Sequence, residues 1–195
     1  MGAGGGRWAA AVGEDGAAEV EAEAGVGDFR VEVFQAGAGA SEAAGPEGAG
    51  EMKAHDFIGQ LKHEEIVAAI RAAEKETSGE IRVFVSRKKV TDPVVAAQAH
   101  FFELGMEKTR EHNGVLLFVA PRTHKFAVIG DAGVHSKCGD EFWSALATEM
   151  SGYFRRSEFT SGLVHGVRKA GELLAKHFPR RPDDTNELPD EVVHD

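Results

Sequence analysis

A run of five large apolar residues constrains the fold of this chain more than any other feature. The run, Val115-Leu-Leu-Phe-Val119, follows an Asn113-Gly114 pair that is typical of a turn. Because the run is apolar on both of the faces that a strand presents, it predicts a central strand buried on both sides. Such a strand requires helices packed on the sheet.

The flanking segments predict the neighbouring elements. Ile81-Arg-Val-Phe-Val85 and Lys125-Phe-Ala-Val-Ile129 have the character of strands, and the second follows a tight turn that begins at Pro121. Asp92-Pro93 is typical of a helix N-cap and first turn. Apolar residues at helical spacing indicate helices around 66–73, after Asp92, over 139–155 and over 159–177. The predicted order is αβαββαα, with helices on a small mixed sheet.

This order brings four polar side chains to one edge of the sheet. The first two strands are joined by a helix and should be parallel, whereas the short turn makes the third antiparallel to the second. The end of the third strand then lies beside the beginnings of the other two, and the helix near residue 140 starts from the same edge. The side chains that should converge are Glu80, Asn113, Asp131 and Asp140.

Carboxylate and amide oxygens are hard ligands, so this group would suit Ca²⁺, with Mg²⁺ as the alternative, rather than zinc. Each residue also has an ordinary structural explanation. Asp131 and Asp140 could serve a turn and a helix start, Glu80 could be a solvated charge, and Asn113 could take a positive φ in a turn. A rival zinc site at His135-x-x-Cys138 has no second pair of ligands in the sequence.

Composition divides the chain into three parts. Residues 1–51 are rich in Gly, Ala and Glu, and we expect a disordered leader or a mis-assigned start codon. Residues 52–178 should form the domain, and residues 179–195 an acidic disordered tail. The net charge of −10 argues against nucleic acid and anionic lipid as partners. One Cys and the absence of a long apolar run suggest a cytoplasmic protein that is not in a membrane.

Four short motifs in order resemble the TPM-domain family, which is known from a chloroplast photosystem-repair phosphatase and bacterial relatives. They are Thr77-Ser-Gly-Glu80, Asn113-Gly-Val-Leu-Leu117, Gly130-Asp-Ala-Gly133 and Gly139-Asp140, within about residues 55 to 178. The ending His177-Phe-Pro179 resembles the small soluble bacterial branch. The resemblance implies a three-layer α/β/α sandwich around a mixed sheet of three or four strands. It also implies calcium binding in some members and acid-phosphatase activity in a plant member.

Two functions are compatible with these observations. One is a divalent-cation-binding module for protein interaction or quality control, and the alternative is a metal-dependent acid phosphatase acting on phosphoesters. The sequence contains no phosphate loop and no recognisable nucleophile motif, which favours the first. Arg82 and Arg87 flank the first strand and could orient an anion, but we expect both to be solvated surface arginines. Whether the chain is an enzyme stays open, as do its partner and its oligomeric state.

Overall fold

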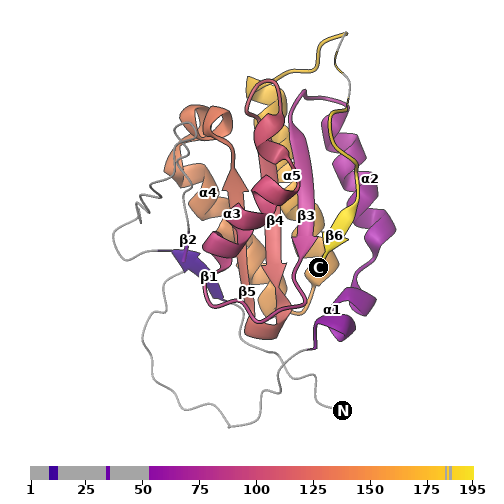
Figure 1. Ribbon diagram of the computed structural model, residues 1–195, viewed down its shortest axis with the longest axis vertical. Coiled ribbons are helices and arrows are strands. Elements are labelled where there is room, and N and C mark those ends of the chain that lie inside the picture. The colour runs from indigo at the N-terminus through magenta and orange to yellow at the C-terminus, as the bar shows by residue number, and fades with distance from the viewer. Residues whose placement is uncertain (1–8, 13–33, 36–52, 183, 185) are drawn as a thin grey trace.

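The computed structural model describes residues 9–12, 34–35, 53–182, 184 and 186–195. In this part of the chain a mixed sheet lies between helices on both of its faces, as Figure 1 shows. The strands are β1 (Ala9–Val12), β2 (Phe34–Gln35), β3 (Glu80–Val85), β4 (Gly114–Ala120), β5 (Lys125–Gly130) and β6 (Val192–His194). The α-helices are α1 (Ala54–Gln60), α2 (His63–Glu74), α3 (Pro93–Glu103), α4 (Ala132–Arg155) and α5 (Phe159–His177), with short 3₁₀ helices η1 (Met106–Lys108) and η2 (Pro121–Thr123).

Local chemistry explains where several elements begin and end. The Asp92 side chain accepts hydrogen bonds from the amides of Val94 and Val95, at 2.8 and 3.3 Å, and so caps α3. Between β4 and β5, η2 ends at His124, whose φ of 51° reverses the chain. The tight turn that was predicted here therefore joins two antiparallel strands.

The strand order is β2-β1-β5-β4-β3-β6. β3 runs parallel to β4, and β4 runs antiparallel to β5, which confirms the predicted topology. The register places Glu80 opposite Gly114, and Val115 opposite Gly130. The start of β3, the start of β4 and the end of β5 consequently share one edge of the sheet.

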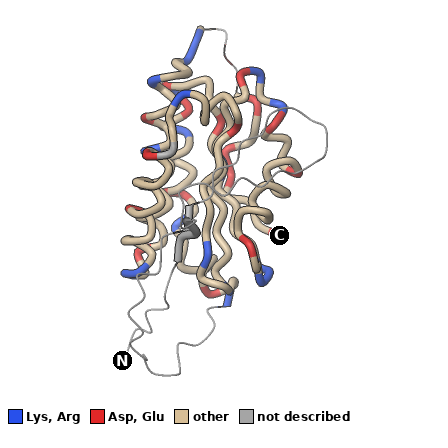
Figure 2. The backbone as a smooth tube through the Cα atoms, turned by 90° about the vertical axis from the view of Figure 1, so that its left-hand side faces the viewer, with Lys and Arg blue, Asp and Glu red and all other residues tan. Residues whose placement is uncertain are grey.

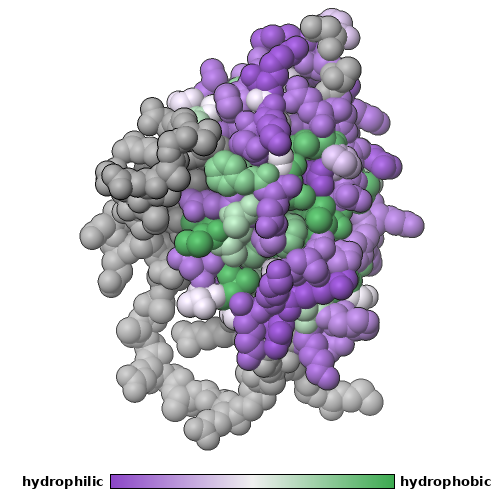
Figure 3. Space-filling view, in the orientation of Figure 1, coloured by the Kyte–Doolittle hydropathy of each residue, from purple (hydrophilic) through white to green (hydrophobic). Residues whose placement is uncertain are grey.

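The sheet separates two hydrophobic clusters. All seven residues of β4 are buried, in agreement with the prediction of a central strand. The larger cluster lies between the sheet and α2, α4 and α5, and the smaller lies under α3. Figure 2 views the sheet from its side and shows both helical layers. On the α3 side Figure 3 shows apolar residues at the surface, and Val95 and Phe102 are 53% and 45% exposed.

The fold agrees with the predicted mixed α/β sandwich, and the differences lie at α4 and at the tail. α4 begins at Ala132, because Asp131 caps it directly after β5, and the helix start predicted near Gly139 coincides with a kink at Gly139 that separates two helical segments. Residues 9–12 and 34–35, inside the expected leader, form short strands, and the rest of residues 1–51 lies outside the described residues. The tail from residue 179 was expected to be disordered, whereas its described residues include β6, which pairs with β3.

None of the helices in the described ranges combines the length and the apolar character that crossing a membrane requires.

Candidate functional site

Asp131 is buried at the sheet edge, and its two carboxylate oxygens have different surroundings. Its Oδ1 accepts a hydrogen bond of 2.6 Å from the Ala132 amide at the start of α4. Its Oδ2 is buried and lies 3.4 Å from His112 Nδ1, with which it forms an ion pair when that imidazole is protonated; no shorter hydrogen bond to Oδ2 is present among the described residues. Burial raises the pKa of this carboxyl, although the Ala132 amide and His112 oppose the rise. A buried carboxylate oxygen with only one long contact is unusual in folded proteins.

Further oxygen atoms lie close to the start of α4. Gly133 packs so tightly that a Cβ there would lie 2.4 Å from the His112 carbonyl oxygen and 2.6 Å from that of Glu111. Glu107 Oε2 is also buried and lacks a donor in the described structure. Burial is the main cause of the raised pKa of Asp131, and the charge of Glu107 adds to it. Asp131 and Glu107 therefore each have a buried carboxylate oxygen near this end of the sheet that accepts no hydrogen bond from the described residues.

Glu80, the first residue of β3, is 3% exposed. Its Oε1 accepts a 2.8 Å hydrogen bond from the amide of Glu187 in the tail, while its Oε2 has no donor among the described residues. Burial raises the pKa of Glu80 to about 7, against the effect of the Glu187 amide. The alternative considered for Glu80, a solvated charge, is therefore wrong, because this carboxyl is buried and accepts a hydrogen bond from the tail.

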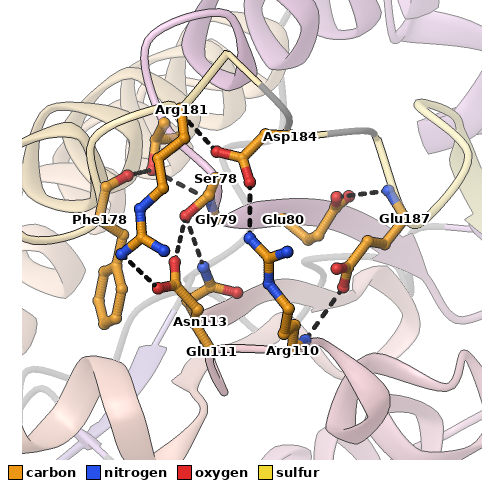
Figure 4. Close-up of polar contacts among 11 residues, drawn as sticks. Ser78, Gly79, Glu80, Arg110, Glu111, Asn113, Phe178, Arg181, Asp184 and Glu187 are labelled. Atoms are coloured by element: carbon orange, nitrogen blue, oxygen red, sulfur yellow. Dashed lines mark hydrogen bonds and ion pairs between the residues drawn. The ribbon is translucent and has the colours of Figure 1, made fainter.

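Asn113 joins a polar network rather than acting only in a turn. Its Nδ2 donates to Ser78 Oγ at 3.2 Å, and Ser78 Oγ donates to Glu111 Oε2 at 2.6 Å (Figure 4). Arg181 Nη2, from the tail, lies 3.1 Å from Glu111 Oε1. The positive φ that was considered for Asn113 belongs to its neighbour His112, at 50°.

Asp140 follows a kink in α4. Gly139, with φ 67° and ψ 172°, separates two helical segments at this point, and the second follows Gly139, where the sequence predicted a helix start. The strand register brings Glu80, Asn113 and Asp131 to one edge of the sheet, and Asp140 stays a predicted ligand. In the described parts of the chain, no three acidic, His or Cys side chains are grouped closely enough to hold a metal ion.

Glu74 is a buried acid that was missed at the sequence level. Its Oε1 accepts a 2.9 Å hydrogen bond from the Ile81 amide, and burial raises its pKa to about 9. It lines a cavity of about 270 Å³ between the end of α2 and the tail. A signal was available, because Glu74 continues the apolar stripe of Ile66 and Ile70 at steps of four residues.

Arg82 was expected on the surface but is 3% exposed. It lies on β3 under the tail, with Nη2 at 4.0 Å from Glu191 Oε1. Burial lowers the pKa of its guanidinium, although the surrounding acids oppose this effect. Arg82 is therefore not presented to a solvent-borne anion, whereas Arg87 is exposed as expected.

A sequence model of the TPM domain matches residues 53–173. The chain belongs to the TPM-domain family. A search of the solved structures finds the NMR structure of the BA42 protein from the psychrophilic bacterium Bizionia argentinensis, at 40% identity. The match covers 70% of this chain and 96% of that protein, with a TM-score of 0.64. No curated protein matches the chain.

The TPM match contains Glu80, Asn113, Asp131 and Asp140, but it ends before the tail. The groups that cover the sheet edge, from Arg181 through Glu187 to β6, follow the matched region. The site thus combines residues of the TPM domain with a covering segment that lies outside the domain match.

Proposed function

We propose that this TPM domain is a divalent-cation-binding module that docks a protein partner. The ion would be Ca²⁺, with Mg²⁺ as the alternative. The proposal depends on one observation above all: the buried Oδ2 of Asp131, for which the described residues supply no hydrogen-bond donor. A bound cation would add positive charge beside this oxygen, whose long contact to His112 Nδ1 measures 3.4 Å.

The residues at this edge fit a hard cation in their chemistry. Asp131 and Glu80 each have one carboxylate oxygen held by a backbone amide and one left without a donor. Oxygen ligands of this kind are preferred by Ca²⁺ and Mg²⁺. Asp131 would be the central ligand, Glu80, Asn113 and Asp140 stay as the predicted further ligands, and Glu107 is added because its Oε2 is buried nearby.

Calcium titration of the melting temperature tests the proposal. A cation that binds only the folded state stabilises it by RT ln(1 + [L]/Kd), about 1.4 kcal/mol at ten times Kd. We expect Ca²⁺ to raise the melting temperature of the wild type and Asp131→Asn to remove most of that rise. The Asn side chain retains an oxygen for the Ala132 amide, so the helix cap should survive.

The matched control is Asp92→Asn, because Asp92 caps α3 in the same manner but lies away from the sheet edge. This variant should keep the full calcium-dependent rise. A melting temperature unchanged by millimolar Ca²⁺, or a rise that Asp131→Asn leaves intact, would contradict the proposal. Amide chemical shifts recorded during the titration would locate the ion.

The alternative function, a metal-dependent acid phosphatase, makes a different prediction. It requires turnover of a phosphoester that a chelator and Asp131→Asn both abolish. It is supported by the family resemblance alone, and Arg82, which was considered for orienting an anion, is buried under the tail. We therefore favour the cation-binding module, in the cytoplasm as the sequence suggested.

A further inference from the structure

The tail, residues 179–195, lies beside the sheet edge that carries the proposed cation ligands. Its strand β6 pairs in parallel with β3 at three positions. The tail therefore occupies the outer side of β3, whereas β4 and then β5 follow on the other side. Glu80, the first residue of β3, consequently stands between the tail and Asp131, which follows β5.

The tail binds the Glu80 side chain directly. The Glu187 amide donates a 2.8 Å hydrogen bond to Glu80 Oε1, and Figure 4 shows the Glu80 carboxylate turned toward Glu187. Burial raises the pKa of this carboxyl, and the amides of Glu187 and Leu188 oppose the rise. The Glu80 residue is only 3% exposed. With the tail in this position, Glu80 is directed at the tail and covered by it.

A second contact of the tail leads to Asn113, another predicted ligand. Arg181 Nη2 lies 3.1 Å from Glu111 Oε1, and Glu111 Oε2 accepts a 2.6 Å hydrogen bond from Ser78 Oγ. Ser78 Oγ in turn accepts a 3.2 Å hydrogen bond from Asn113 Nδ2 (Figure 4). The tail is therefore connected to two of the predicted ligands, directly to Glu80 and through this network to Asn113.

The width of the sheet decides what Glu80 can contact. Glu80 lies opposite Gly114 of β4. The next residue of β4, Val115, lies opposite Gly130 of β5. The start of β3 and the end of β5 are thus two strand spacings apart, roughly 10 Å. Bonds from Ca²⁺ or Mg²⁺ to oxygen are only about 2.0–2.6 Å long, so one ion reaches Glu80 and Asp131 only if both side chains turn toward β4.

The Glu80 side chain turns toward the tail instead. This orientation is consistent with the finding that no three acidic, His or Cys side chains of the described residues are grouped closely enough to hold a metal ion. The contact between the tail and Glu80 and a contact between Glu80 and an ion at Asp131 are therefore alternatives.

We propose that the tail regulates the cation site by competing with the ion for Glu80. With the tail docked, Glu80 is withheld from the ion; with the tail released, Glu80 turns toward β4 and joins Asp131. The inference rests on the proposed function and concerns the regulation of that same site. Because linked binding equilibria are reciprocal, loosening the tail must raise the affinity for the cation, and the cation must loosen the tail by the same factor.

Glu187→Pro tests the competition in the full-length chain, because proline has no amide hydrogen to donate to Glu80 Oε1. Calorimetric titration with Ca²⁺ is the measurement. We expect a Kd about tenfold lower than that of the wild type, since the competing state loses a hydrogen bond to a charged group. Glu187→Ala is the matched control: it loses the same side chain, including its 3.2 Å contact with the Arg110 amide, but keeps the donor. Its Kd should equal that of the wild type.

Glu80→Gln shows whether the effect passes through Glu80. Gln keeps an oxygen for the Glu187 amide but is a weaker ligand for a cation. In the Glu80→Gln background, Glu187→Pro should change the Kd for Ca²⁺ by less than about twofold, because the group for which tail and ion compete has been removed. The reciprocal effect is visible in the wild type, where saturating Ca²⁺ should accelerate amide hydrogen exchange in β6 severalfold without changing β4.

Equal Ca²⁺ affinities of the wild type and Glu187→Pro, or weaker binding by Glu187→Pro, would overturn the inference and leave the proposed function intact. A tenfold gain that persists in the Glu80→Gln background would also overturn it, because the tail would then act on another group. If neither the wild type nor Glu187→Pro binds Ca²⁺, the proposed function fails and the inference fails with it. Binding by Glu187→Pro alone would support both.

Discussion

β4 and the tail pack against the same sheet by different physical means. β4 has seven residues, all buried, and large apolar side chains on both of its faces. The tail has three residues in β6, none buried; Leu188, Val192 and Val193 pack at the margins of the two clusters, and the remaining contacts include ion pairs and hydrogen bonds. Burial of apolar area stabilises a fold whatever the ionic conditions, whereas exposed ion pairs weaken with salt. The two segments should therefore respond very differently to mutation, pH and salt.

The largest effect is expected in β4. Leu117 is fully buried between the sheet and α5, and Leu117→Asp would place an unpaired charge there. We expect loss of cooperative folding, measured by thermal denaturation and by the dispersion of amide resonances. Leu188→Asp, in the tail, is the matched control and should leave a folded domain. A folded, cooperatively melting Leu117→Asp protein would abolish the distinction between the two segments.

The next effect lies where α4 meets the sheet edge. A Cβ at Gly133 would lie 2.4 Å from a backbone carbonyl, which cannot move aside as a flexible side chain can. Gly133→Ala should therefore destabilise the fold by about 1–3 kcal/mol, the usual cost of overpacking. Gly59→Ala is the control, because nothing lies within 4 Å of a Cβ at that glycine. Equal melting temperatures for both variants would show that this edge is as adaptable as the tail.

β4 was predictable because burial leaves a local pattern. Val115 to Val119 are apolar at every position, and the Asp92-Pro93 pair marks the start of α3 in the same local manner. The tail could not be predicted in this way. Arg71 and Asp190 are 119 residues apart, and an acidic segment has the same composition whether it is docked or solvated. The composition of the tail therefore does not indicate which basic residues it contacts.

The candidate site was predictable in part, because the local sequence indicates how the strands are connected. Strand topology correctly brought Glu80, Asn113 and Asp131 to one edge, because parallel and antiparallel connections follow from loop length. The helical segment predicted to begin near Gly139 follows the kink at that residue, but the segment over 132–138, which Asp131 caps, was not predicted. Glu74 was overlooked although an acid on an apolar stripe indicates a buried carboxyl.

A smaller effect concerns pH, at the boundary between the core and the tail. Glu74 has an ordinary pKa of 4.5 when unfolded and about 9 when folded. Between these values the folded state binds more protons, so the free energy of unfolding falls as pH rises, by at most about 1.4 kcal/mol per pH unit. Glu74→Gln has no proton to lose and retains an acceptor for the Ile81 amide. The melting temperature of Glu74→Gln should equal that of the wild type near pH 4.5 and should exceed it at pH 8.

Thermal melts between pH 4.5 and 9 measure this difference. Glu64→Gln, an exposed acid on α2, is the control and should follow the wild-type curve. Parallel curves for Glu74→Gln and the wild type would mean that Glu74 is ionised when folded, and the boundary between core and tail would then tolerate a buried charge.

The smallest effect is expected at the tail itself. Lys88 is 74% exposed, and its Nζ lies 3.2 Å from Asp195 Oδ2. Lys88→Ala should cost only a few tenths of a kcal/mol, seen as faster hydrogen exchange in β6 with no change in β4. In 0.5 M NaCl the difference should disappear, because salt screens exposed pairs. Lys169→Ala, which breaks an α5 pair away from the tail, should leave β6 exchange unchanged. If Lys88→Ala also accelerated exchange in β4, the tail would be part of the cooperative core, and the two segments would differ in composition but not in stability.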